Sequence, residues 1–198
     1  VVQVTDGSDV MLNATGDLAL GDVTAAGTLQ ITSATHLLLD GVMTVATLDA
    51  TATAGAISQG KQGQLKVISG PTDLEAKGDI TLANTGNDFS GVLNASGVNI
   101  TLTDRTNGLS LGDINASGQL TASSHDGLDL SGTLEVGSLA LSSSVASITQ
   151  SAGSLTVNKG PSQLEAAGNI TLTQANAFAG VVQVTDGSDV MLNATGDL

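Results

Sequence analysis

The chain has 198 residues, no cysteine, and 19 acidic against five basic residues, which gives a formal net charge of −14. This excludes disulfide stapling and nucleic-acid binding, because such a surface repels phosphate, and no membrane insertion is expected because no apolar run approaches about 18 residues. With two Phe and no Trp or Tyr, the apolar content is aliphatic, which favours a narrow core of stacked Leu, Val, Ile and Ala over an aromatic-rich globular core.

Apolar residues alternate with polar ones in short bursts along the whole chain. A period of two predicts β-strands with one buried face. Gly, Thr, Ser and Asn interrupt every candidate helix, so we expect no helix of consequence. The bursts begin at Val10, Leu18, Leu29, Leu37, Leu65 and Ile80, and again at Ile100, Leu109, Leu120, Leu128, Leu139, Leu155 and Ile170.

The bursts recur at a fixed spacing of 19 residues, as from Leu18 to Leu37 and from Leu29 to Leu48. Two interleaved series with one spacing predict a coil of about 19 residues that carries two or three short strands. Coils stacked at about 4.8 Å form a parallel β-helix, so about 180 residues would give roughly nine coils and a rod of roughly 45 Å. The same spacing returns from Leu109 to Leu128 and from Leu120 to Leu139.

Residues 50–64 and their counterpart, residues 142–154, are the weakest strand candidates, and we expect a looser coil or a small protrusion there. An immunoglobulin-like sandwich is the competing all-β fold, since its domains have about 100 residues. A sandwich would place linkers between its domains, and its core would be aromatic. The chain shows neither feature, and a 19-residue spacing has no role in a sandwich.

The sequence repeats itself on two scales. Residues 181–198 repeat residues 1–18 letter for letter, and a shorter unit of about 90 residues occurs twice. The only two prolines, Pro71 and Pro161, precede similar segments, and the only two aromatics, Phe89 and Phe178, lie in NDFSG and NAFAG. We therefore predict that residues 1–198 form a single continuous β-helix segment, with internal units at about 1–90 and 91–180 and a restart at 181–198.

Two pairs of carboxylates are candidates for acid–base chemistry on sugars, which needs two carboxyl groups about 5–10 Å apart. Asp6 with Asp9 and Asp126 with Asp129 both lie beside glycine in turn-like contexts. Turn carboxylates ordinarily accept backbone N–H groups, and sugar sites ordinarily stack rings on aromatics. We therefore expect solvated turn residues and predict no catalytic residue.

No metal or cofactor site is predicted either. The two histidines, His36 and His125, occupy non-equivalent places in the two units, and a structural zinc site needs about four ligands. Calcium-binding β-roll nonapeptides are absent, although Gly-Asp pairs recur at Asp17, Asp22, Asp79 and Asp113. Glycosylation of an exported chain is possible at six Asn-x-Ser/Thr sequences, which begin at Asn13, Asn94, Asn99, Asn115, Asn169 and Asn193.

The run GDITLANTGNDFSGVLNASGVNITLTDRTNGLSLGDINASGQLTA, residues 78–122, resembles the repeat regions of filamentous-haemagglutinin-like exoproteins of Gram-negative bacteria, the two-partner-secretion adhesins. The cadence extends over essentially the whole chain. The resemblance implies a right-handed parallel β-helix shaft, export through an outer-membrane β-barrel transporter, and an extracellular location on the bacterial cell surface. It carries over no catalytic residues.

We therefore expect a non-enzymatic shaft segment of a large secreted or surface-displayed adhesin that mediates cell–cell, biofilm-matrix or host attachment. Its partners would be polysaccharide or a neighbouring cell surface. One alternative is a repeat module that itself binds exopolysaccharide. Another is a β-helix enzyme that degrades polysaccharide, against which the missing sugar-stacking aromatics and the five basic residues weigh.

Overall fold

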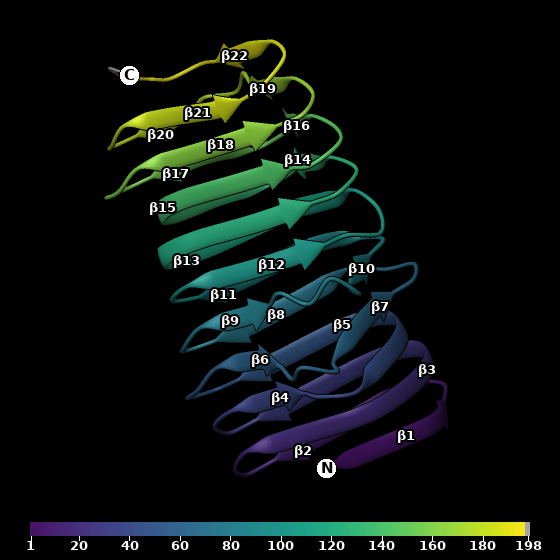
Figure 1. Ribbon diagram of the computed structural model, residues 1–198. Coiled ribbons are helices and arrows are strands. Elements are labelled where there is room, and N and C mark those ends of the chain that lie inside the picture. The colour runs from purple at the N-terminus through teal and green to yellow at the C-terminus, as the bar shows by residue number, and fades with distance from the viewer. Residues whose placement is uncertain (197–198) are drawn as a thin grey trace.

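The computed structural model describes residues 1–196, and these form 22 β-strands and no helix (Figure 1). Every strand pairing is parallel, and each strand pairs with the strand one coil earlier or later. The chain winds through about ten coils of about 20 residues. None of the described residues belongs to a helix that could span a bilayer. The predicted parallel β-helix is confirmed, and the sandwich is excluded because its strands would pair antiparallel.

The strand segments stack into three columns, which we treat as the three faces of the rod. The acidic face comprises β2 (Val10–Ala14), residues 28–33 of β3 (Leu18–Ser33), residues 47–52 of β5 (Val42–Ala52), β8 (Thr72–Ala76), β11 (Val92–Gly97), residues 114–116 of β13 (Leu109–Ser124), residues 133–136 of β15 (Thr133–Ser143), β17 (Ser154–Val157) and β20 (Ala177–Phe178).

The neutral face follows the acidic face along each coil. It comprises residues 18–20 of β3, β4 (Leu37–Leu39), β6 (Ile57–Gln59), β9 (Ile80–Leu82), β12 (Ile100–Asp104), residues 119–124 of β13, residues 138–143 of β15, β18 (Ser162–Ala166) and β21 (Val182–Asp186).

The third face completes the coil. It comprises β1 (Val2–Gly7), residues 23–25 of β3, residues 42–45 of β5, β7 (Gln64–Val67), β10 (Asp88–Phe89), residues 109–111 of β13, β14 (Leu128–Leu130), β16 (Ile148–Gln150), β19 (Ile170–Leu172) and β22 (Val190–Leu192).

The core consists of inward-facing aliphatic residues that stack on their counterparts in the next coil. Under the neutral face one such column is fully enclosed, and each member is at most 1% exposed. Burying one side chain of this size stabilises the fold by about 1.5–3 kcal/mol, so stacking the columns is the main force that holds the rod. This column contains Leu37, Ile57, Ile80, Ile100, Leu120 and Leu139.

The predicted 19-residue spacing is confirmed in the first coils, since Leu18 pairs with Leu37 and Leu29 with Leu48. The coil is longer elsewhere, because Leu48 pairs with Thr72. The added residues lie in turns, including residues 60–63. Residues 50–64 were predicted to be loose, yet their central segment is the regular strand β6, which pairs with β4 and β9. The inward-facing Ile57 explains why this short strand persists.

Equivalent strands of successive repeats lie on different faces. From β2 the chain passes β3, β5, β8 and β11 on the acidic face, which is four coils, and then reaches β12 on the neutral face. β12 is the counterpart of β2 in the second unit. The repeat therefore spans four coils plus a third of a turn, and each unit is rotated by one face relative to the unit before it.

Candidate binding groove

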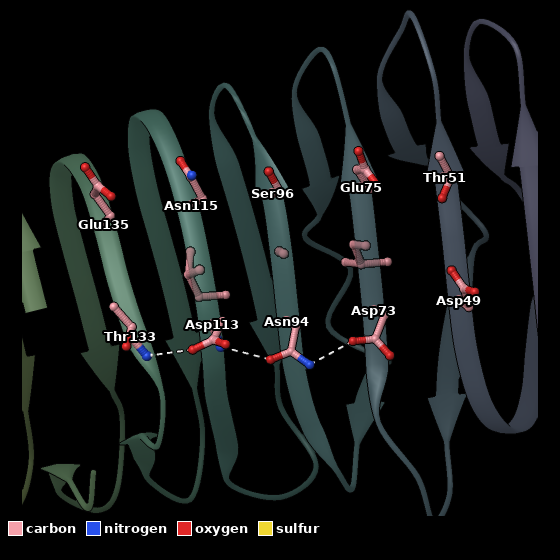
Figure 2. A pocket seen from close by; sticks show the side chains of 13 residues that line it. Asp49, Thr51, Asp73, Glu75, Asn94, Ser96, Asp113, Asn115, Thr133 and Glu135 are labelled. Atoms are coloured by element: carbon pink, nitrogen blue, oxygen red, sulfur yellow. Dashed lines mark hydrogen bonds between the residues drawn. The ribbon is translucent and has the colours of Figure 1, made fainter. Parts of the chain in front are cut away.

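A groove of about 510 Å³ lies along the acidic face, over the coils that contain β5, β8, β11, β13 and β15 (Figure 2). Alternation along each strand sends two outward side chains to opposite sides of the groove. The first row contains Asp49, Asp73, Asn94, Asp113 and Thr133, and the second contains Thr51, Glu75, Ser96, Asn115 and Glu135.

The first row is a hydrogen-bonded ladder. Asn94 Nδ2 donates to Asp73 Oδ1 at 2.7 Å, and Asn94 Oδ1 accepts the N–H of Asp113 at 2.8 Å. Asp113 Oδ1 in turn accepts the N–H of Thr133 at 2.9 Å, as the dashed lines of Figure 2 show. Asp49 accepts a hydrogen bond from Gln30 Nε2 at 2.9 Å. These side chains are held in place before any ligand arrives.

The side chains of the second row make few hydrogen bonds by comparison. Glu135 accepts a bond from Asn158 Nδ2 at 3.3 Å, whereas Glu75 is exposed and makes no hydrogen bond within residues 1–196. The groove thus has one wall held by a hydrogen-bonded ladder and one wall with few hydrogen bonds, and five carboxylates line it. Such a groove can present acceptors to hydroxyl groups or cations at the coil spacing of about 4.8 Å.

In the Gly-Asp pairs considered as calcium ligands, the aspartate side chains accept hydrogen bonds from the backbone. In each pair, the aspartate accepts the N–H of a residue one coil further on. Asp79 Oδ1 accepts from Asn99 N at 3.0 Å, and Asp22 Oδ1 accepts from Val42 N at 2.9 Å. Asp17 accepts from His36 N and from the hydroxyl of Thr35, and these bonds lower the pKa of its carboxyl from 3.8.

Three carboxylates of the two candidate acid pairs make hydrogen bonds to nearby groups of the fold. Asp126 contacts Nδ1 of His125 at 2.8 Å, while Asp129 accepts from the hydroxyl of Thr149 and from the N–H of Ser151. In the other pair, Asp9 accepts the N–H of Thr28 at 2.8 Å. The turn role predicted for these carboxylates matches these bonds.

The two histidines lie apart from each other and from the groove. His36 Nδ1 accepts the N–H of Ala56 at 3.1 Å, so its acceptor nitrogen is in use. Among residues 1–196 no group of three His, Cys, Asp or Glu side chains is arranged to hold a metal ion.

Four of the six Asn-x-Ser/Thr sequences use their asparagine in the fold. Asn169 Oδ1 accepts the N–H of Asp189 at 3.2 Å, and Asn193 Nδ2 donates to the carbonyls of Thr173 and Gln174. Asn94 and Asn99 each donate through Nδ2 to an aspartate one coil earlier and accept through Oδ1 from a backbone N–H one coil later. Glycosylation at either residue would break its ladder. Asn115 is exposed in the groove. Modification at the other sequences stays a prediction.

The structure reveals a buried pair of side-chain amides that the sequence motifs do not predict. Asn87 is fully buried and exchanges two hydrogen bonds with Gln59, at 2.6 and 3.1 Å. It also accepts the N–H of Leu65 at 3.0 Å. Gln150 and Asn176 repeat this arrangement in the second unit. The recurrence of SQ or TQ with NDF or NAF was the available signal, but nothing local linked residues more than 20 positions apart.

Among the described residues, Asp104 is the carboxylate whose side chain is fully buried. Its oxygens accept the N–H groups of Phe89 at 2.7 Å, Thr106 at 3.0 Å and Asn107 at 3.2 Å. Burial raises the pKa of Asp104 above 3.8 despite these bonds, and the nearby Asp88 carboxylate acts in the same direction. The equivalent residue in the first unit is Ala14, so this carboxylate distinguishes the second unit.

The repeat provides a second, smaller groove of about 220 Å³, formed by β15, β18 and β21 together with Thr121 of β13. These strands are the counterparts of β5, β8 and β11. Because each unit is rotated by one face, this groove lies on the neutral face. Ala140 and Gln163 occupy the places of Asp49 and Asp73, and Glu165 corresponds to Glu75.

A family model described as "Repeats of unknown function (DUF5649)" matches residues 35–96, 97–138 and 123–185. The matches recur along the chain, as its internal repetition predicts. No curated protein and no solved structure matches the chain.

Proposed function

The chain belongs to the DUF5649 family of repeats of unknown function, and we propose that it is a shaft segment of a large secreted or surface-displayed bacterial adhesin. It is a repeat protein with a β-solenoid fold, which is compatible with a repetitive structural module. The resemblance to filamentous-haemagglutinin-like repeats supports the adhesin role, export through an outer-membrane transporter and an extracellular location. The role proposed is mechanical and non-enzymatic.

The observation that carries the proposal is the continuity of the coil stack. Each coil buries its aliphatic side chains only against the coils above and below, so length can be added without changing the core. The end coils illustrate this dependence, because Val4, Val10 and Leu12 are only partly buried, as are Val182 and Val184. A further coil on either end would cover them.

Chains of one, two and three 180-residue periods test the shaft. Solution scattering and electron microscopy should show a maximum dimension that grows by about 42 Å per period at constant cross-section. The melting temperature should rise with the number of periods, since the fraction of poorly covered end coils falls. Equal midpoints, or a compact particle, would contradict the proposal.

The adhesin role needs a separate experiment in a bacterium that produces the protein. Antibodies against this segment should label intact cells, and shortening the array by whole periods should reduce attachment while surface amounts stay equal. Attachment that does not depend on array length would contradict the proposed adhesin role and leave only the rod.

Binding of exopolysaccharide by the repeats is a second candidate, favoured by the groove on the acidic face with its two rows of polar side chains. A glycan array probed with the wild-type chain and with Glu75→Gln would raise this candidate if binding were seen and the variant reduced it. Degradation of polysaccharide would appear as new reducing ends after incubation with plant and bacterial polysaccharides, and we expect none.

A further inference from the structure

The outward centre of the neutral face carries no charge over nine coils. Each position pairs in register with the next, so the residues form one unbroken column. The outward carboxylates of this face, Glu165 and Asp186, lie beside the column at its C-terminal end. The column contains Ala19, Leu38, Ser58, Thr81, Thr101, Thr121, Ala140, Gln163 and Gln183.

Four of the five basic residues of the chain lie at the two borders of this face. Lys61 and Arg105 are in the turns that leave β6 and β12, whereas Lys77 and Lys159 are in the turns that enter β9 and β18, and all four are exposed. Carboxylates share these borders. They include Asp17, Asp40, Asp79 and Asp126. The neutral face thus has an uncharged centre and borders of mixed sign.

We propose that the neutral face is a docking surface for a second copy of this chain, which uses its own neutral face. Each copy has a net charge of −14, so contact through the acidic face would oppose the carboxylates of Asp73 and Glu75 to those of a neighbour. The neutral face avoids this repulsion, and its mixed borders let a cation of one copy meet a carboxylate of the other. Contact of a face with itself is two-fold and closes at a dimer.

The size of the face sets the strength of the contact. Nine coils at about 4.8 Å extend over about 38 Å, and strands of three to six residues give a width of roughly 13 Å. About 500 Å² would be buried on each copy, or about 1,000 Å² in total, which is at the lower limit of specific interfaces. The dimer is therefore weak and depends on concentration.

In a longer array, rotation of the repeat limits how far this contact can extend. This consequence rests on the proposed function as a shaft of many periods. The identical strands β1 and β21 lie on the third face and the neutral face, two thirds of a turn apart. The uncharged column therefore moves to another side in each 180-residue period. Successive periods would contact different neighbours and build a mesh of rods.

The chain of residues 1–198 is sufficient for the test. Sedimentation equilibrium from about 10 μM to 1 mM should show a monomer–dimer equilibrium, and scattering should show that the dimer is wider and no longer than the monomer. The dimer should tighten as salt rises from about 0.05 to 0.5 M, because screening weakens the repulsion between the two net charges. Thr101→Glu with Thr121→Glu, on adjacent coils of the neutral face, should raise Kd at least about tenfold.

Thr24→Glu with Thr44→Glu is the matched control, because these threonines pair on adjacent coils of the third face. It should change Kd by about twofold or less. Circular dichroism and melting temperature verify that all variants fold. Monomers throughout the range, equal weakening by both variants, or end-to-end dimers would overturn the proposal and leave the shaft function intact. Tightening by Thr101→Lys with Thr121→Lys, reversed by salt, would also overturn it and identify the acidic face as the partner surface.

Discussion

The groove on the acidic face and its counterpart on the neutral face are built by equivalent strands of the two units, yet they differ in chemistry. Asp49 and Asp73 of the first become Ala140 and Gln163 in the second, and the volume falls from about 510 to about 220 Å³. The inward positions beneath the two grooves change less, since Leu48 is matched by Leu139 and Leu74 by Leu164. Stacking constrains what faces the core, whereas the outward surface of each repeat is free to diverge.

The largest effect is expected from removing the buried asparagine amide, which tests whether the cores of the two units are equivalent. Asn87→Ala and Asn176→Ala should each lower the free energy of unfolding by about 2–4 kcal/mol, because each leaves a buried backbone N–H, that of Leu65 or Leu155, without its partner and removes two hydrogen bonds from the neighbouring glutamine. Chemical denaturation measures both. Asn115→Ala is the exposed control and should stay within about 0.5 kcal/mol. Unequal costs at Asn87 and Asn176 would show that the two cores are not equivalent.

Substitution of the glycines at the corners of the coils is expected to have the next largest effect on stability. A Cβ at Gly41 would overlap the backbone at Gly21, and a Cβ at Gly132 would overlap the backbone at Gly112. Gly41→Ala and Gly132→Ala should therefore each cost about 1–3 kcal/mol. Gly16→Ala has open space around its Cβ and serves as the control in the same thermal melts. If all three variants melted alike, close corner stacking would not limit the fold.

Asp104 tests the feature that only the second unit has. Because burial raises its folded-state pKa above 3.8, the unfolded chain releases this proton at lower pH than the folded chain. The contribution to stability is therefore full below pH 3.8 and is lost as pH rises through the folded pKa. Unfolding titrations of the wild type and Asp104→Asn between about pH 3 and 7 should diverge in this direction. Parallel curves would refute it, and Asp126→Asn controls for an exposed carboxylate.

The smallest effect is expected from exchanging the outward residues of the two grooves. Asp49 and Asp73 are direct cross-strand neighbours, and like charges at such positions are mildly destabilising. Asp49→Ala with Asp73→Gln should change stability by about 0.5 kcal/mol or less, because relief of the like charges is offset by loss of the hydrogen bond from Gln30 to Asp49. Ala140→Asp with Gln163→Asp should lower it by about 0.5 kcal/mol. Calorimetry can resolve both changes. A large loss in either exchange would mean that these outward residues help to hold the coil.

The strands, the parallel stack and the aliphatic columns were predictable, because alternation and spacing report directly on which side chains face inward. Leu18 and Leu37 pair as their spacing indicated. Turn lengths were not predictable to the residue, which is why the coil lengthens between Leu48 and Thr72. The larger groove depends on side chains from five coils, and the Gln59–Asn87 pair joins the end of β6 to the segment before β10 in the next coil, so neither has a local signature.

The sequence by itself determined that this protein is a repeating all-β rod with an aliphatic core, since these properties follow from local alternation and internal repetition. The tertiary structure alone decided where each repeat faces. That position depends on the summed length of every turn, and the sum leaves a third of a turn over in each unit. The same stretch of sequence therefore lies on different sides of the rod in residues 1–16 and in residues 181–196, which no comparison of letters could reveal.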